Sequence, residues 1–413
     1  FQKSSIMCEE DEDVLLMLKS LFSSSSSNDS LWSEVTASEQ TACNDTIIVG
    51  TTTEVPNNVT STLEFGKRVY AYVTPFIIIL GFIGNTTSLY IYLTKPMKKV
   101  SASLFLSAIC LSDCLVLTAY VLPDWLYRGL QYWPGGFAVK VITINGVCQL
   151  FMISAYMFRF TSVWLILVFT IERFIAVCKP LQQRSLCSRR TSRISILLVF
   201  TGGALLGITK AAMSSVHTMT RNSTYHACAG RPDLEKANFM FDLGYAALIT
   251  CIPYLVITVC NILILHELAF KKIAIRIDST RAMLTQRLRR ELTLTLLAIS
   301  TCFVLLNLPY FAIWLHITIL TSSLKHANDP HYFTATVRQL VELKKWLFVC
   351  RTAFYTNYAI NMFLYYITGS QYRKRMSELL ASATLRFHTA FAFGSRQSQG
   401  FKRTPTPSTT TEK

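Results

Sequence analysis

Seven long apolar segments constrain this chain of 413 residues more than any other feature of its sequence. Each is near or above the roughly 20 residues that a helix needs to cross a bilayer. Only 15% of the residues are charged, whereas a soluble domain carries about 25%. The sequence therefore predicts an all-α protein, a seven-transmembrane helix bundle. The helices are expected at Val69–Leu93, Ala102–Leu122, Ile144–Val177, Ile194–Ala212, Phe239–Leu265, Leu292–Leu320 and Trp346–Ile367.

Basic residues mark one side of the predicted bundle. Lys and Arg gather in 95–99, 179–193 and 271–290, which follow the first, third and fifth apolar segments, and again after residue 370. The positive-inside rule makes these segments cytoplasmic and places the amino terminus outside the cell. The net charge of +16 is divided among short loops. This placement favours membrane lipids and a cytosolic protein as partners, and it argues against nucleic acid.

The first 66 residues are rich in Ser, Thr, Asn and acidic residues and have no periodic apolar face. This composition predicts a disordered tail on the outer side. Four Asn-X-Ser/Thr sequons also lie on the predicted outer side and predict N-glycosylation. Their acceptors are Asn28, Asn44, Asn58 and Asn222.

Polar side chains recur at a similar depth in several of the apolar segments. They include a carboxylate, which in mid-membrane needs donors, water or a cation. One interpretation is a hydrogen-bonded network that fixes helix packing. The other is a sodium or proton site whose occupancy biases two helix arrangements. The residues concerned are Asp113, Ser162, Asn357 and Asn361.

Several short motifs occur in a fixed order along the apolar segments. They are Gly84-Asn85, Leu111-Ser112-Asp113, Trp133, Cys148, Glu172-Arg173-Phe174, Pro253, Phe303 with Pro309, and Asn361-Met362-Phe363-Leu364-Tyr365. With these motifs, residues 66–382 resemble the rhodopsin-like (class A) G-protein-coupled receptors. The resemblance implies a multi-pass plasma-membrane receptor and not an enzyme. Such a receptor binds an extracellular ligand and signals to a heterotrimeric G protein and to arrestin.

The resemblance also implies roles for single residues. Glu172 matches an acid that neutralises the helix-three arginine in the inactive state. Arg173 matches that arginine, which contacts the G protein once helix six moves outward, so the pair is a two-state element. The implied activation switch consists of Glu172, Arg173, Pro309, Asn361 and Tyr365.

The family pattern also implies a disulfide between Cys148 and Cys228, and it favours an allosteric sodium ion at the buried polar residues. It divides the chain into an extracellular tail (1–66), a receptor domain (67–369), a short amphipathic eighth helix (370–382) and a cytoplasmic tail (383–413). Several positions depart from the family, two of them in the sixth and seventh helices. Asn307 stands where an aromatic toggle is usual, and Met362 stands where the seventh helix usually has proline.

The outer half of the bundle is expected to hold the ligand. Amine receptors of this family have an aspartate where this chain has Ala155, and opsins have the retinal lysine where it has Tyr355. Mixed charges and aromatic rings favour a peptide, and the seventh-helix stretch "NMFLYYITG" is similar to the invertebrate FMRFamide-receptor-like group. The expected pocket residues are Asp124, Arg159, Asp242, Trp314, His316, Arg351 and Tyr355.

Other interpretations remain beside the peptide receptor. A class A receptor for a lipid, a nucleotide or an odorant would have the same framework. A transporter would show repeated or broken helices in matching halves, and the sequence has no such repeats. The seven His are scattered singly and give no metal spacing, so no cofactor other than the sodium ion is expected.

Overall fold

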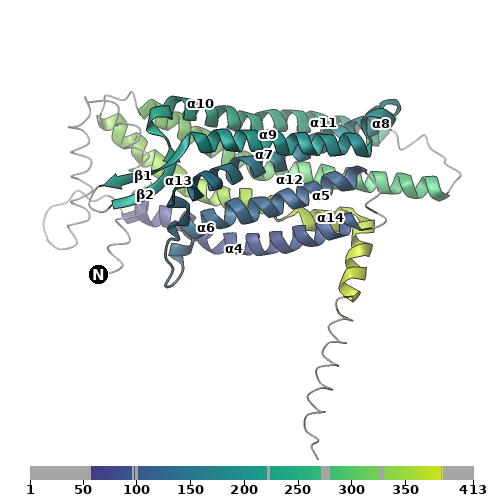
Figure 1. Cartoon of the computed structure of the whole chain (residues 1–413), viewed down its shortest axis with the longest axis horizontal. Coiled ribbons are helices and arrows are strands. Elements are labelled where there is room, and N and C mark those ends of the chain that lie inside the picture. The colour runs from purple at the N-terminus through teal and green to yellow at the C-terminus, as the bar shows by residue number, and fades with distance from the viewer. Residues whose placement is uncertain are drawn as a thin grey trace, which may run out of the picture.

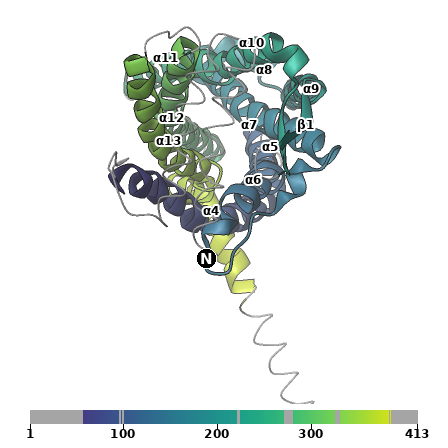
Figure 2. The same ribbon diagram turned by 90° about the vertical axis from the view of Figure 1, so that its left-hand side faces the viewer.

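The computed structural model describes residues 57–94, 97, 101–220, 224–270, 280–324, 330–382 and 384. The long helices run side by side along one axis (Figure 1) and form a ring when viewed from one end (Figure 2). In chain order the helices are α4 (Asn57–Leu93), α5 (Ser101–Val116), η2 (Leu117–Val121), α6 (Leu122–Arg128), η3 (Leu130–Tyr132), η4 (Lys140–Thr143), α7 (Val147–Cys178), α8 (Pro180–Leu186), α9 (Arg189–Ala212), η5 (Pro232–Leu234), α10 (Glu235–Ala246), η6 (Ala247–Cys251), α11 (Ile252–Phe270), α12 (Thr280–Leu324), α13 (Pro330–Thr356) and α14 (Asn361–Thr368).

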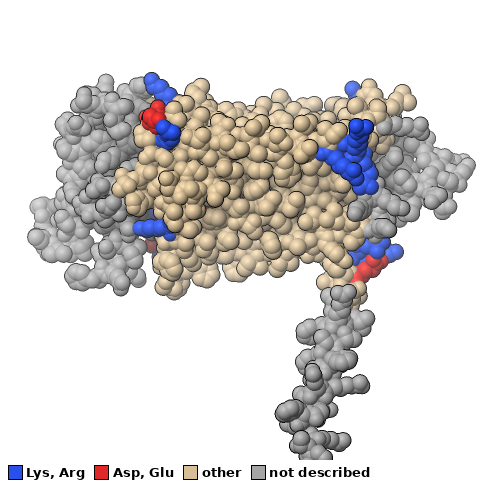
Figure 3. All heavy atoms as spheres, in the orientation of Figure 1, with Lys and Arg blue, Asp and Glu red and all other residues tan. Residues whose placement is uncertain are grey.

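All seven predicted apolar segments are largely helical. Among the described residues, 6 stretches are long and apolar enough to cross a membrane, namely Glu64–Leu93, Ser101–Arg128, Val147–Cys178, Arg189–Ala212, Pro232–Ala269 and Arg290–Leu324. The seventh segment falls on α13 and α14, which a turn at 357–360 separates. On the face in Figure 3, the coloured charged side chains lie at the two ends of the bundle and leave a tan band between them. Such a band suits contact with lipid.

The ends of the receptor domain differ from the prediction in one place. Helix α4 begins at Asn57, so residues 57–66, which the sequence assigned to the disordered tail, are helical. The acceptors Asn28, Asn44 and Asn222 lie outside the described residues, and Asn58 lies in the first turn of α4. Glycosylation of these sites stays a prediction.

Residues 370–382, where an eighth helix was predicted, are helical in the structure. Tyr372 and Met376 are buried, whereas Arg373 and Lys374 are exposed. The hydroxyl of Tyr372 lies 2.8 Å from the Ser88 hydroxyl of α4 and forms a hydrogen bond with it. This spacing gives the helix one apolar side; its position on lipid headgroups stays a prediction.

Two spans contain a turn wider than an α-helical turn. The π-helical turn η2 joins α5 to α6, and the π-helical turn η6 joins α10 to α11. Each precedes a proline at the second position of the next helix, Pro123 in α6 and Pro253 in α11. Proline has no N–H and its ring clashes with the preceding turn, so a widened turn accommodates it. Pro309, by contrast, lies inside the continuous helix α12.

A β-hairpin that the sequence analysis did not predict lies between α9 and α10. Strands β1 (Ser214–Thr220) and β2 (Thr224–Gly230) pair antiparallel, with Val216 opposite Cys228. The hairpin lies at the same end of the bundle as α6 and α10 (Figure 1). We call this end the hairpin end and the opposite end, which carries α8, the α8 end.

Helix α9 packs closely on α7 because it presents small residues. A side-chain carbon added to Gly203 would lie 2.9 Å from the Met157 carbonyl oxygen, and one added to Gly207 would lie 2.7 Å from that of Ile153. Glycines four residues apart let two membrane helices approach backbone to backbone. The tightness of this contact fixes α7, which carries Arg159, Ser162 and the Glu172–Arg173 pair.

Candidate functional site

Three of the four predicted sodium-site residues meet inside the bundle. The Asp113 carboxylate, 1% exposed, accepts hydrogen bonds from the Ser162 hydroxyl (2.7 Å) and from the Asn361 amide (2.6 Å). Asn357 is buried in the turn between α13 and α14. Nearby, the Asn85 amide donates to the Tyr358 carbonyl at 2.7 Å. These bonds compensate for the helical bonds lost where the seventh span breaks, and each carboxylate oxygen has further lone pairs for a cation.

The predicted switch pair is formed. Nη2 of Arg173 lies 3.3 Å from Oε2 of Glu172, and both side chains are buried. Neither carboxylate oxygen of Glu172 has a hydrogen-bond partner among the described residues. The guanidinium lies 5.5 Å from the ring centre of Phe169. An ion pair without hydrogen bonds holds less strongly than a bidentate one, which suits a contact that must open.

The loop beside this pair contains a thiol. Sγ of Cys187 donates to the Glu172 backbone carbonyl at 3.6 Å. Burial, and then the charge of Glu172, raise the pKa of the Cys187 thiol above its usual value. The thiol therefore stays protonated at neutral pH and acts as a weak donor to α7.

The other predicted switch residues lie on α12 and α14. Tyr365 is fully buried, and its ring lies 5.2 Å from that of Tyr92 and 5.7 Å from that of Tyr372. Its hydroxyl accepts a hydrogen bond from Sγ of Cys110 at 3.7 Å. Tyr365 thus belongs to an aromatic cluster that joins α4, α14 and the helix at 370–382.

One contact between the sixth and seventh spans was missed by the sequence analysis. The Glu291 carboxylate of α12 accepts a hydrogen bond from the Ser370 backbone N–H at 3.1 Å and another from the Ser370 hydroxyl at 2.5 Å. One turn further along α12, the Thr295 and Thr368 hydroxyls lie 2.7 Å apart. Ser370 is the first residue of the helix at 370–382, so its backbone N–H has no partner within that helix, and the Glu291 carboxylate supplies one. This contact holds α12 against the seventh span.

A cavity of about 140 Å³ lies between α7, α10, η6, α11, α12 and α13. Three of the predicted ligand residues, Arg159, Asp242 and Trp314, line it. His316 is exposed and lies outside the lining. Asn307, at the position of the family's aromatic toggle, lines the cavity and donates its amide to the Phe303 carbonyl at 2.6 Å.

The remaining predicted ligand residues belong to a separate network around Asp124. The Asp124 carboxylate accepts hydrogen bonds from Tyr70 (2.7 Å), Tyr355 (3.0 Å) and Nε of Arg128 (3.0 Å), and Nη1 of Arg351 lies 3.7 Å away. These donors come from α4, α6 and α13. Because the carboxylate is fully engaged by protein groups, the network ties three helices together and is not open to a ligand in this arrangement.

Asp242 has a cationic partner that the sequence analysis did not identify. Nζ of Lys210, on α9, lies 2.7 and 2.8 Å from the two Asp242 oxygens and 2.7 Å from Oδ1 of Asn238. The Tyr156 hydroxyl also donates to Asp242 at 2.7 Å. Lys210 is the only charged residue in the predicted span Ile194–Ala212. That isolation was a signal for a paired, buried cation.

Arg159 has no such partner. Its guanidinium carbon lies 5.4 Å from the ring centre of Tyr120 and 5.5 Å from that of Phe354. No hydrogen bond or ion pair reaches it from the described residues, and its Nε is buried. Asp242, the other charged residue that lines the cavity, is already neutralised by Lys210.

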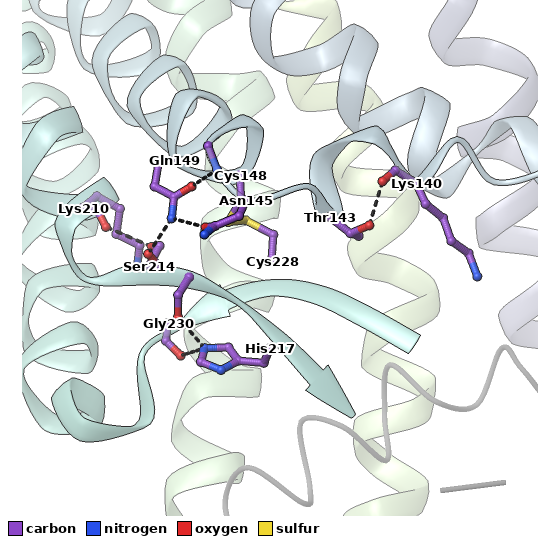
Figure 4. The surroundings of a disulfide bond; sticks show 12 residues. Lys140, Thr143, Asn145, Cys148, Gln149, Lys210, Ser214, His217, Cys228 and Gly230 are labelled. Carbon is purple, nitrogen blue, oxygen red and sulfur yellow. Dashed lines mark hydrogen bonds between the residues drawn. A yellow bond between two sulfur atoms is a disulfide. The ribbon is translucent and has the colours of Figure 1, made fainter. Parts of the chain in front are cut away.

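The hairpin end is fixed by the predicted disulfide (Figure 4). Cys148, at the start of α7, bonds to Cys228 of β2 with 5.6 Å between their Cα atoms. Beside it, the Gln149 amide donates to Oδ1 of Asn145 at 3.0 Å and to the Ser214 carbonyl at 3.4 Å (Figure 4). The hairpin is thereby attached to α7 over the ends of the helices that line the cavity.

Comparison with known proteins gives one family. Residues 84–365 match the family described as 7 transmembrane receptor (rhodopsin family). Cysteinyl leukotriene receptor 2 of Mus musculus is 25% identical over 345 residues, which cover 82% of this chain and 99% of that protein. An FMRFamide peptide receptor of Caenorhabditis elegans is 27% identical over 139 residues, 34% of this chain and 32% of that receptor. 2-oxoglutarate receptor 1 of Rattus norvegicus is 21% identical over 260 residues, 63% of this chain and 73% of that protein.

The match covers more than half of the chain and begins and ends within the helix bundle. It agrees with the apolar helices, with the charged residues at the two ends and with the switch pair on α7. The family also supplies the seventh span, which α13 and α14 form together. The chain therefore belongs to the rhodopsin family of seven-transmembrane receptors, and it is a membrane receptor and not an enzyme.

Proposed function

We propose that this receptor binds an extracellular peptide, a neuropeptide, in the cavity between α7 and α12. The observation that carries the proposal is the lining: aromatic rings surround a buried, unpaired arginine. Ligand sites combine an apolar wall with a few polar groups that fix orientation. A peptide that presents one ring and one polar group to Arg159 fits this pattern.

A non-peptide ligand is the second candidate. Cysteinyl leukotriene receptor 2, which matches 82% of this chain, is named for a cysteinyl leukotriene, and another relative is named for 2-oxoglutarate. The FMRFamide receptor matches only 34% of the chain. The coverage of the leukotriene receptor therefore favours testing a leukotriene beside the peptides.

We propose that ligand binding is transmitted to a heterotrimeric G protein by movement of α12 and release of Arg173. Two contacts support this route. The Glu172–Arg173 pair has no hydrogen bonds to the carboxylate among the described residues, and Glu291 holds α12 to Ser370. Both contacts are polar, lie away from the cavity and can break without loss of apolar burial.

The orientation and the further partners follow from the same proposal. Basic residues between the first and second, third and fourth, and fifth and sixth spans support a cytoplasmic location for those loops, and the amino terminus is proposed to lie outside the cell. Arrestin is proposed as a second cytosolic partner. An allosteric sodium ion is proposed at Asp113, whose neighbours Ser162 and Asn361 leave each carboxylate oxygen further lone pairs.

A panel of neuropeptides, together with a cysteinyl leukotriene, on cells that express the full chain tests the proposal, with calcium and cyclic AMP read together. We expect a peptide to give the response. Glu172→Gln is expected to raise basal signalling because it removes the charge that restrains Arg173, and Arg173→Ala is expected to abolish coupling with binding retained. If both variants couple like the parent, the proposed switch is wrong. If only the leukotriene gives a response, the ligand is not a peptide and the second candidate function is the correct one.

A further inference from the structure

The cavity carries one uncompensated positive charge. Among its lining residues in the described part of the chain, only Arg159 and Asp242 are charged. Lys210 contacts both Asp242 oxygens, so that acid and its cation cancel. Arg159 is left with two aromatic rings as neighbours and no acid. Because a lone buried charge costs several kcal/mol of desolvation, a group that neutralises it gains binding free energy.

The neighbours of Arg159 limit what that group can be. Rings attract a cation through their faces but do not accept the in-plane hydrogen bonds of a guanidinium. Its N–H donors therefore suit a carboxylate, which accepts two parallel bonds from arginine. A neutral primary amide offers only one carbonyl oxygen to the guanidinium. Its two N–H donors cannot hydrogen-bond to the guanidinium, which has no acceptor.

The aromatic lining and the volume of the cavity limit the size of the ligand group that can bind beside Arg159. Seven aromatic side chains besides Phe354 line the cavity, namely Tyr156, Tyr245, Tyr254, Tyr310, Phe311, Trp314 and Tyr358. The cavity measures about 140 Å³. An engineered apolar cavity of about 150 Å³ takes up one benzene molecule. The space therefore holds one ring beside the arginine and not a whole peptide.

We propose that Arg159 anchors a carboxylate that is attached next to an aromatic ring. A free carboxyl-terminal Phe or Tyr of a peptide has this chemistry, and so does a small aromatic acid. The inference rests on the proposed function in that the cavity is the ligand site. It goes further in choosing an ionised acid over a capped amide, and its test needs no G protein.

The experiment uses the full chain, purified in detergent, and three probes. N-acetyl-phenylalanine carries the acid and the ring, its primary amide lacks the charge, and N-acetylglycine lacks the ring. Binding is measured as the rise in melting temperature with probe concentration, because a ligand that binds only the folded state stabilises it. We expect the acid to bind at least about tenfold more tightly than either control, which is roughly 1.4 kcal/mol. Equal binding of the acid and its amide to the parent overturns the proposal.

Variants of Arg159 locate the effect. Arg159→Met is expected to melt at a higher temperature than the parent without probe, because a charge with no acid is removed, and to lose the preference for the acid. Arg159→Lys keeps the charge but not the fork, so its preference should be intermediate. Arg351→Met is the matched control: it breaks the ion pair with Asp124, so it should melt lower and keep the preference. A preference that survives Arg159→Met overturns the proposal; if that variant does not fold, the parent and Arg159→Lys decide.

A fourth probe distinguishes the source of the carboxylate. The tetrapeptide Phe-Met-Arg-Phe with a free carboxyl terminus is compared with N-acetyl-phenylalanine on the parent chain. At least about tenfold tighter binding of the peptide, roughly 1.4 kcal/mol, identifies a peptide end as the anchored group. Binding no tighter than that of the small acid identifies a small aromatic acid. If N-acetyl-phenylalanine binds no more tightly than its amide, no acid is anchored and the inference is wrong.

Discussion

Lys210 and Asp242 form an ion pair, and removing one partner is expected to destabilise the receptor more than removing the other. The Lys210 side chain is 5% exposed, whereas that of Asp242 is 31% exposed and lines the cavity. Removing one partner of a buried pair costs about 3–5 kcal/mol when the other charge stays buried. That full cost applies to Asp242→Ala, because Lys210 would keep only Oδ1 of Asn238.

Lys210→Met should cost less. Asp242 would keep the Tyr156 hydroxyl at 2.7 Å, and its exposed oxygen can bind water from the cavity. The loss then approaches that of a hydrogen bond to a charged group, about 1.5–3 kcal/mol, less the packing that Met retains against the Tyr156 ring. We therefore expect Asp242→Ala to be the more destabilising change by about 1–2 kcal/mol. The double variant Lys210→Met/Asp242→Ala should recover part of the loss.

The assay is thermal unfolding of the purified receptor at one scan rate, since membrane proteins often unfold irreversibly. A thiol-reactive dye reports opening, because Cys110 and Cys260 are free and buried. Asp233→Ala, which removes the exposed ion pair with Arg231, is the matched control and should shift stability by less than about 1 kcal/mol. The reasoning fails if Lys210→Met is as destabilising as Asp242→Ala, or if the double variant is the sum of the two.

Three further outcomes are expected. Cys148→Ser or Cys228→Ser should each lower surface expression and stability, and the double change should add little because both remove one bond; additive losses would exclude the bridge. Agonist affinity should fall as sodium rises, and Asp113→Asn should flatten that dependence; an affinity indifferent to sodium in the parent limits Asp113 to packing. Glu291→Gln should raise basal nucleotide exchange on an added G protein, because a neutral amide holds Ser370 more weakly than a carboxylate does; unchanged basal exchange would show that this contact does not restrain α12.

The sequence predicted the framework well and the partners of single charges less well. The seven apolar segments follow from segment length, which is a local property, whereas the Cys148–Cys228 bond and the Glu172–Arg173 pair were implied by the resemblance to the family. The ion pairs inside the bundle depend instead on which helices are neighbours. Asp242 pairs with Lys210 because α9 lies beside α10 near the hairpin (Figure 1).

The cavity lining separates two residues that the sequence analysis had grouped together, Trp314 and His316. Trp314 and His316 are two residues apart on one helix, hence about 200° apart around its axis. They could not both face the cavity, and only Trp314 does. The sequence was sufficient to separate these two. It was not sufficient to place Tyr355 in the Asp124 network, because that contact joins α13 to α6 across the bundle.

The two π-helical turns affect how this chain can be compared with its relatives. A π turn holds one more residue than an α turn, so the helix beyond it is rotated by about 100° relative to an uninterrupted α-helix. In a relative without η2, a gap-free alignment would pair Asp124 with a residue on a different face. Conversely, the loss or gain of one residue at η6 would present a new set of α10 side chains to the cavity. The part of the same span on the other side of the turn, toward the α8 end, would keep its contacts, so the cavity lining can change during evolution while the α8 end of the bundle stays the same.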